Sequence, residues 1–175
     1  RALTTGASRT AEIQRQLMPA MLGWFAEGPN PDLGLLSFRQ LSEEMGGTSW
    51  YMRALRDEGQ MAELLASILS SSRYVIRMIG YVPGAVQMLA DASQLAVRPR
   101  EALVETMSAA ARRHDDTDGA VEALRTVRCR ELTRLALGDA LGLIGTQDVG
   151  AGLSSVMGAT IDVALAIAAR EQDGP

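Results

Sequence analysis

A chain of 175 residues is long enough for one ordinary domain or two small lobes, but not for several domains. Apolar residues make up 47% of it and aromatic residues only 4%, which favours packed helices over a β-sandwich. The net charge of −4 argues against a general nucleic-acid or anionic-membrane surface, and the single cysteine excludes an internal disulfide and indicates a reducing cytoplasm.

The first third of the chain predicts two helices separated by a firm break. Apolar residues at helical spacing predict a helix over roughly 9–26, and the sequence EGPNPD at 27–32 ends it. Asn30 followed by Pro31 is a good N-cap with a proline at the first helical position, so a second helix begins there. That helix is expected to end at the glycine pair 46–47.

Short helices follow in the middle of the chain. One helix is predicted to carry Trp50 up to about residue 58, and another runs from about residue 60 to the serine run 70–72. The serines are expected to cap the sequence RYVIRMIGY at 73–81, and the proline at position 83 to open a short helix that ends near residue 91.

The last part of the chain predicts three longer helices. The first covers 100–113, and HDDTDG at 114–119 interrupts the pattern before a helix over roughly 118–143. At 1.5 Å per residue this helix is about 40 Å long, enough to be the spine of the domain. GTQDVG at 145–150 breaks it, and a final helix extends to about Arg170.

We therefore predict an all-α fold, a helical bundle of about eight or nine helices with one long spine helix. It would form a single helical domain over 1–175, with 9–91 and 100–170 as possible sub-lobes. Residues 1–10 lack the apolar region of a signal peptide. The most apolar stretch, 151–169, contains two serines and Asp162, so it is expected to fall short of a membrane span.

The helix predicted at 118–143 carries charged residues on its apolar face. At 100° per residue, an arc of about 80° holds four apolar side chains: Val121, Leu124, Leu132 and Leu135. Arg128 and Asp139 fall inside that arc, and Glu131 lies at its edge. Removing the partner of a buried charge can cost about 3–5 kcal/mol. The pattern predicts a polar network of Arg128, Glu131 and Asp139 on the inner face.

Three other arginines of this helix, Arg125, Arg130 and Arg134, point away from the apolar arc and are predicted to face outward, available to an adjacent module. The simplest interpretation of all these charges is a structural salt-bridge network inside the bundle. An interdomain or ligand role stays open beside it, because ion-pair networks often imitate functional sites.

Two other features have ordinary structural explanations. The acidic residues that follow His114 resemble a metal cluster, but Asp at a helix start caps the helix and opposes its dipole, which is the simpler interpretation. A lone cysteine in a helix, such as Cys129, is more often a small core residue than a reactive thiol. The sequence contains no dinucleotide-binding glycine motif, no Walker A loop and no HExxH motif.

The segment RCRELTRLALGDALGL, preceded by HDDTDGAVEALRTV and followed by GLSSVMGATIDVALAIA, resembles a helical segment of bacterial glutamine synthetase adenylyltransferases. This family comprises bifunctional enzymes that also remove the adenylyl group. The stretches at 33–59 and 64–89 agree as well, and the actinobacterial type fits best. One departure is Gly138, which stands where the family pattern has an Arg before Asp139, so an Arg-Asp pairing there cannot be carried over.

The resemblance implies a linking and regulatory region of a cytoplasmic enzyme several times longer than this chain. Such enzymes carry two nucleotidyltransferase modules, one adding AMP to glutamine synthetase from ATP with Mg²⁺ and one removing it. Their active sites need a Gly-Gly or Gly-Ser turn with an Asp-x-Asp pair. This sequence has no such turn. The resemblance thus implies an inert segment without cofactor or metal. Its implied partners are the flanking modules, glutamine synthetase, the PII protein and glutamine.

Two alternatives of other classes remain at this stage. One is a free-standing helical binding module, such as the effector domain of a transcriptional regulator. The other is a small enzyme with Arg128, Glu131 and Asp139 as its site, although it would lack a nucleophile and a metal cage. A DNA-binding helix-turn-helix would need a basic recognition helix, and none of the short helices is one.

Overall fold

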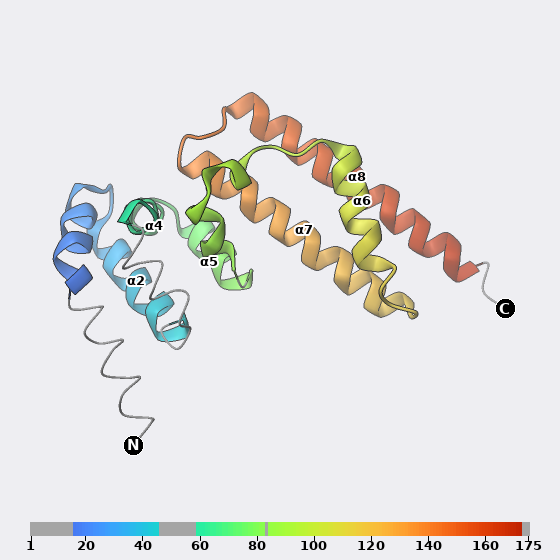
Figure 1. Cartoon of the computed structure of the whole chain (residues 1–175), viewed down its shortest axis with the longest axis horizontal. Helices are drawn as coiled ribbons and strands as arrows, with labels where there is room; N and C mark the ends of the chain where they lie inside the picture. Colours follow the sequence, from blue (N-terminus) through green and yellow to red (C-terminus); the bar gives the residue numbers. More distant parts are fainter. Residues whose placement is uncertain (1–15, 46–58, 83, 173–175) are drawn as a thin grey trace, which may run out of the picture. The chain divides into compact units, whose positions relative to one another are not determined.

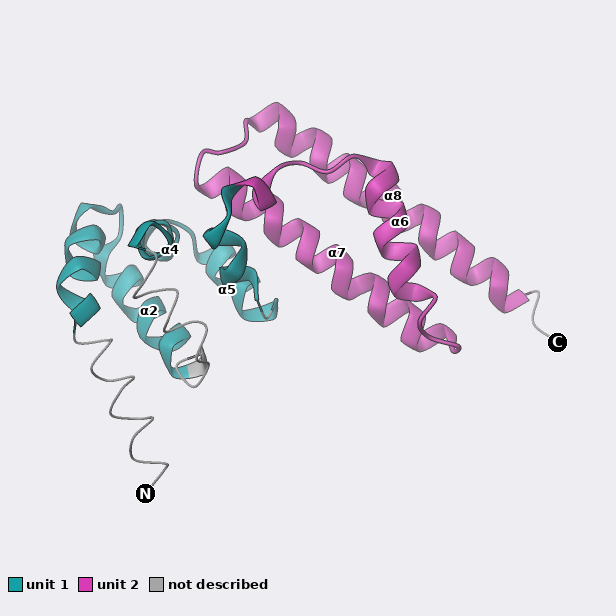
Figure 2. Ribbon diagram, in the orientation of Figure 1, with its two compact units in different colours: residues 1–92 teal, residues 93–175 magenta. Residues whose placement is uncertain are grey.

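The computed structural model describes residues 16–45, 59–82 and 84–172. All regular secondary structure in these ranges is helical, which confirms the all-α prediction (Figure 1). The chain divides into two compact units, residues 1–92 and 93–175, shown in different colours in Figure 2. The boundary falls between the two predicted sub-lobes, while the single-domain assignment stays a prediction.

Unit 1 consists of short helices whose ends follow local sequence signals. Residues 16–27 are helical, and the next elements are α2 (Pro31–Met45), α4 (Gly59–Ser71), α5 (Arg73–Tyr81) and the 3₁₀ helix η1 (Ala85–Ala90). The N–H of Leu33 donates to Asn30 Oδ1 at 2.9 Å, which confirms the predicted cap of α2. Ser72 caps α5 in the same way, as predicted. The helix predicted around Trp50 lies outside the described residues.

The core of unit 1 is apolar and centres on α4. Seven residues of this helix are buried: Met61, Ala62, Leu65, Ala66, Ile68, Leu69 and Ser70. Helix α4 packs against α2, α5 and η1. The rings of Phe25 and Phe38 lie 6.1 Å apart at an interplanar angle of 56°, a tilted aromatic pair that joins α2 to the preceding helix.

Unit 2 is built from α6 (Arg100–Ala111), α7 (Thr117–Ala140) and α8 (Thr146–Gln172), each packed against the other two. Helices α7 and α8 run in opposite directions in Figure 1. Their shared core is made of aliphatic side chains and methionine: Leu103, Met107, Ala111, Ala120, Leu124, Leu135, Val156, Ala159, Val163 and Ile167. The predicted spine corresponds to α7, which ends three residues earlier than expected, and α8 is a second and longer helix of 27 residues.

The sequence-based exclusion of a membrane span for α8 was too strong. Within the described residues, α8 is long and apolar enough to cross a membrane by length and composition alone, with a mean hydropathy of 1.6 over 18 residues. The serines and Asp162 do not lower this average enough to exclude a span. Only 28% of that stretch is buried in the structure, so α8 is not enclosed on all sides.

Candidate functional site

The site with the most unusual electrostatics lies on α7, around Glu131. Of the residues that the structure describes, Glu131 is the one charged residue that is buried, with 3% of its surface exposed. Its carboxylate contacts two guanidinium groups: Oε1 lies 3.0 Å from Arg98 Nη1, and Oε2 lies 2.9 Å from Arg134 Nε. A buried carboxylate between two arginines is compensated, whereas an isolated one would be very costly. We call these three residues the Glu131 cluster.

Arg98 connects three parts of unit 2 through one side chain. Besides Glu131 on α7, its guanidinium donates through Nη2 to the carbonyl of Ala102 at 3.2 Å and to Thr106 Oγ1 at 2.8 Å, both on α6. A planar guanidinium can serve such separate acceptors because its donors point in fixed directions. The Glu131 cluster therefore fixes the start of α6 and the segment before it onto α7.

Arg134 fixes the same segment from its other end. Its Nη1 donates to the carbonyl of Gln94, and its side chain is only 12% exposed. The Nε–Glu131 contact is an ion pair without a directed hydrogen bond. Burial lowers the pKa of Arg134, the nearby charges of Arg98 and Arg130 lower it further, and Glu131 opposes them. Arginine stays protonated at physiological pH under such shifts.

The prediction that Arg134 faces outward is therefore wrong. The helical wheel treated only the side facing α6 and α8 as buried. The segment before α6 lies against a different side of α7, where Gln94 and Arg98 reach Arg134 and Glu131. That segment buries an arginine which the wheel placed in solvent.

The predicted network of Arg128, Glu131 and Asp139 is also wrong in two of its members. Asp139 is exposed, because it lies next to the end of α7, where the following turn packs Ile144 on Gly138 instead. Arg128 is half-buried, and its Nε is buried without a hydrogen-bond partner among the described residues. Glu131 thus joins Arg98 and Arg134, and Arg98 is the residue that sequence reasoning missed.

The two remaining arginines lie where the sequence placed them. Arg130 is exposed, and Arg125 is exposed with a 3.8 Å contact to Glu122 one turn earlier. An exposed pair of this kind contributes at most about 1 kcal/mol. Any role for Arg130 toward another module stays a prediction.

The glycine that departs from the family pattern has a packing reason. Gly138 is buried, and a Cβ there would lie 3.1 Å from Ile144 Cδ1 and 3.3 Å from the carbonyl oxygen of Leu95. The neighbouring atoms of Ile144 and Leu95 would have to shift by a few tenths of an ångström to admit even a Cβ there. Position 138 therefore has little room for a side chain between Leu95 and Ile144.

The acidic stretch before α7 acts as a helix cap, as predicted. Asp116 is the N-cap of α7, and its Oδ1 accepts a hydrogen bond from the N–H of Gly119 at 2.6 Å. This hydrogen bond lowers the pKa of the Asp116 carboxyl. In the described part of the chain, no three His, Cys, Asp or Glu side chains are grouped to hold a metal ion. Cys129 is half-buried, and its carbonyl accepts a hydrogen bond from Thr133.

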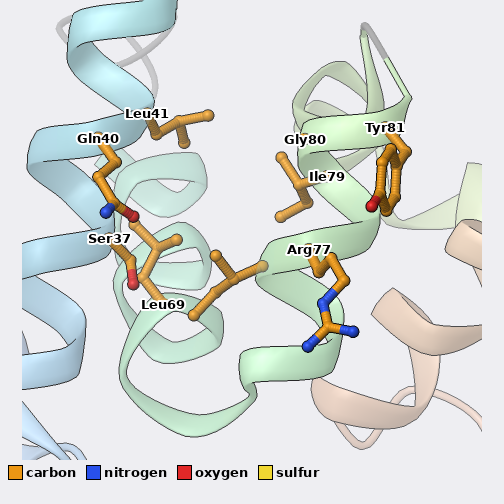
Figure 3. A pocket seen from close by; sticks show the side chains of 9 residues that line it. Ser37, Gln40, Leu41, Leu69, Arg77, Ile79, Gly80 and Tyr81 are labelled. Carbon is orange, nitrogen blue, oxygen red and sulfur yellow. The ribbon is translucent and has the colours of Figure 1, made fainter.

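Unit 1 contains an open pocket of about 330 Å³ between α2, α4 and α5 (Figure 3). Its lining combines apolar and polar side chains: Ser37, Gln40, Leu41, Leu69, Ile76, Arg77, Ile79, Gly80 and Tyr81. Leu41, Leu69 and Ile79 are buried, whereas Gln40, Arg77 and Tyr81 are exposed at the edge. Among the described residues, no base or nucleophile pair converges on this pocket.

Comparison with known proteins gives a consistent family. The family model described as glutamate-ammonia ligase adenylyltransferase matches residues 62–173. A bifunctional glutamine synthetase adenylyltransferase/adenylyl-removing enzyme of Cutibacterium acnes is 50% identical over 175 residues, covering 99% of this chain and 18% of the relative. The enzyme of the same description from Leifsonia xyli is 47% identical over 155 residues, covering 89% of this chain and 15% of the relative.

A third such enzyme, from Streptomyces coelicolor, is 45% identical over 170 residues, which is 93% of this chain and 17% of the relative. The chain therefore spans less than one fifth of the length of these relatives. No solved structure matches the chain significantly.

Proposed function

Because the chain belongs to the glutamine synthetase adenylyltransferase family, we propose that it is the helical linking and regulatory domain of an enzyme that adds AMP to glutamine synthetase and removes it. In this proposal the domain couples the two nucleotidyltransferase modules of the parent enzyme. The match supports this, because it covers 99% of this chain but only 18% of a bifunctional relative.

The observation that carries the proposal is the Glu131 cluster. Units 1 and 2 meet in the chain at residues 92–93, and the first residues of unit 2 run directly to Arg98. Gln94 and Arg98 are held on α7 through Arg134 and Glu131. A domain that couples two modules must transmit a displacement through packed, two-state elements and not through a loose tether. The Glu131 cluster ties the first segment of unit 2 to its helix α7.

The chemistry of the parent enzyme would take place outside this chain. Nucleotidyl transfer needs closely spaced carboxylates that hold metal ions. The Asp-x-Asp sequence at 116–118 does not fit that need, because Asp116 is committed to capping α7. We propose that ATP and Mg²⁺ bind in the nucleotidyltransferase modules. The PII protein and glutamine would act as nitrogen signals on the cytoplasmic enzyme, with this domain passing their effect between the modules.

The substitution Glu131→Gln in the intact enzyme tests the proposal. It removes the charge that joins Arg98 to Arg134 while keeping the side-chain size. We expect the ratio of the adenylylation rate to the adenylyl-removal rate on glutamine synthetase to change by about 2- to 30-fold, the range for residues that modulate coupling. The ratio is the proper readout because a smaller folded fraction lowers both rates equally.

Glu122→Gln is the matched control, since Glu122 lies on the exposed face of the same helix. It should leave both rates and their ratio unchanged. If Glu131→Gln lowers both rates in equal proportion, the Glu131 cluster only supports folding, and the coupling role assigned to it is wrong.

A further inference from the structure

The outer face of α8 is apolar over about five turns. At 100° per residue, eight exposed residues between positions 150 and 168 share an arc of about 120°: Gly150, Leu153, Ser154, Met157, Ile161, Ala164, Leu165 and Ala168. None of them is charged. The four large side chains, Leu153, Met157, Ile161 and Leu165, recur every fourth residue and are 42% to 65% exposed. We call these four residues the α8 stripe, and it is about 18 Å long.

The opposite face of α8 is already in use. Gly152, Val156, Ala159, Val163 and Ile167 are buried in the core that α8 shares with α6 and α7. A surface helix normally places charged and polar residues opposite its buried side, and a helix that is apolar all round is normally buried all round. The α8 stripe is therefore a second contact face without a partner among the described residues.

We propose that, in the intact enzyme, the α8 stripe is covered by an apolar surface of the same polypeptide that lies outside these 175 residues. More than four fifths of the length of the related enzymes has no counterpart in this chain, so they contain ample protein to cover it. A tethered partner also has a high effective concentration and can bind a stripe too short for a stable free complex. This inference rests on the proposed function only in taking the chain as part of that longer enzyme.

A lipid bilayer is a poorer partner for the α8 stripe, although α8 is apolar and long enough to span one. Asp162 lies beside Ile161 in the middle of the helix and forms a bidentate ion pair with Arg100 of α6, with contacts of 2.7 and 3.0 Å. Both side chains are about half exposed. Burying such charges in a bilayer costs several kcal/mol each, whereas a protein surface can leave their edge in water.

Thiol labelling of the intact enzyme tests this inference. The Ile161→Cys variant is treated with a maleimide, and labelling of the peptide that carries the introduced cysteine is followed by mass spectrometry. The matched control is Glu122→Cys on the charged outer face of α7, and each rate is divided by that of the same cysteine in the unfolded enzyme. We expect Ile161→Cys to react at least about tenfold more slowly than Glu122→Cys, the protection given by a contact that opens only occasionally. Leu165→Cys provides a second site if the first variant fails to fold.

Three outcomes would overturn the inference. Equal normalised rates at positions 161, 165 and 122 would mean that the α8 stripe is solvated in the intact enzyme. Protection that disappears on dilution would mean that a second copy covers it. Protection that appears only with phosphatidylglycerol vesicles would mean that lipid covers it. The labelling is independent of the ratio of adenylylation to adenylyl removal. A protected α8 stripe with an unchanged ratio in Glu131→Gln would support docking and contradict the coupling role. A changed ratio with an unprotected stripe would support the coupling role and contradict docking.

Discussion

Helices α7 and α8 are the two longest elements of unit 2 and share one core, yet their outer faces differ in charge. The outer face of α7 is charged, with Glu122, Arg125 and Arg130 exposed. The same helix also buries a charge, Glu131. The outer face of α8 carries no charge from 150 to 168, and its large side chains are aliphatic or methionine.

This difference shows how each helix is completed. A buried charge needs partners, and α7 obtains them from a segment more than thirty residues earlier in the same unit, through Arg98. An exposed apolar stripe also needs a partner, but no described residue covers the α8 stripe. The buried carboxylate of α7 is therefore compensated within unit 2, whereas the α8 stripe has no partner among the described residues.

The largest expected effect concerns the buried charge of α7. Glu131→Gln leaves two guanidinium groups close together without their shared carboxylate, and we expect it to lower the free energy of unfolding of the 175-residue chain by about 3 kcal/mol. This is the lower end of the range for breaking a buried pair, because the Arg98 side chain is 29% exposed. Urea unfolding followed by circular dichroism measures the change. Glu122→Gln should change stability by less than about 0.5 kcal/mol, and equal effects of the two would show that Glu131 is effectively solvated.

The next prediction compares the two faces of α8. Ile167 is buried in the core of unit 2, and Ile167→Ala should lower the free energy of unfolding by about 2 kcal/mol through lost burial and a cavity. Leu165 lies two residues away and is 65% exposed, so Leu165→Ala should cost less than about 0.5 kcal/mol in the same chain. A large loss for Leu165→Ala in urea unfolding would mean that the α8 stripe is covered within the 175-residue chain itself.

The sequence predicted the helices and their ends because those depend on neighbouring residues. Asn30, Ser72 and Asp116 cap the helices they were expected to cap, since an N-cap needs only a short polar side chain and an N–H three residues later. The first two predicted breaks likewise follow from local turn chemistry, because the structure has non-helical residues at 28–30 and 112–116. The break predicted at 145–150 lies earlier, at 141–145, since α8 already begins at Thr146.

The partners in the Glu131 cluster could not be predicted in the same way. Arg98 and Glu131 are far apart in sequence, and no periodic pattern connects a residue in an irregular segment to one on a helix. The wheel placed Glu131 near the buried arc correctly, but it could not show that Arg134 is covered from another side. The one signal in the sequence was the position of Glu131, because a Glu near an apolar arc must be compensated by some basic residue.

A smaller effect is expected at a glycine of α8 that packs closely against α7. Gly152 is buried, and a Cβ there would lie 2.6 Å from Leu135 Cδ2. Gly150 lies on the outer face, and a Cβ there would meet no atom within 4 Å. Alanine gains about 1 kcal/mol over glycine in a helix, so Gly150→Ala should stabilise the chain by up to that amount. Gly152→Ala should destabilise it by about 1 kcal/mol, because overpacking costs more than the helical gain. Thermal unfolding of the two variants measures the sign of each change in stability. If Gly152→Ala also stabilises the chain, the Leu135 side chain moves aside at little cost.

The smallest effect is a pH dependence at the start of α7, where the charged helix begins in solvent. The hydrogen bond from the Gly119 N–H holds the pKa of Asp116 below its ordinary value near 3.8. A carboxyl whose pKa is lowered by folding stabilises the folded state above its unfolded pKa, and this stabilisation is lost as the pH falls through the two values. Acidification below about pH 4 should therefore reduce the helicity of α7 slightly. Asp116→Asn keeps an N-cap that does not titrate, so it should remove this part of the acid response, whereas Asp115→Asn should not. Circular dichroism between about pH 6 and pH 2 compares the two variants, and identical acid responses in both would show that the cap contributes nothing to the stability of α7.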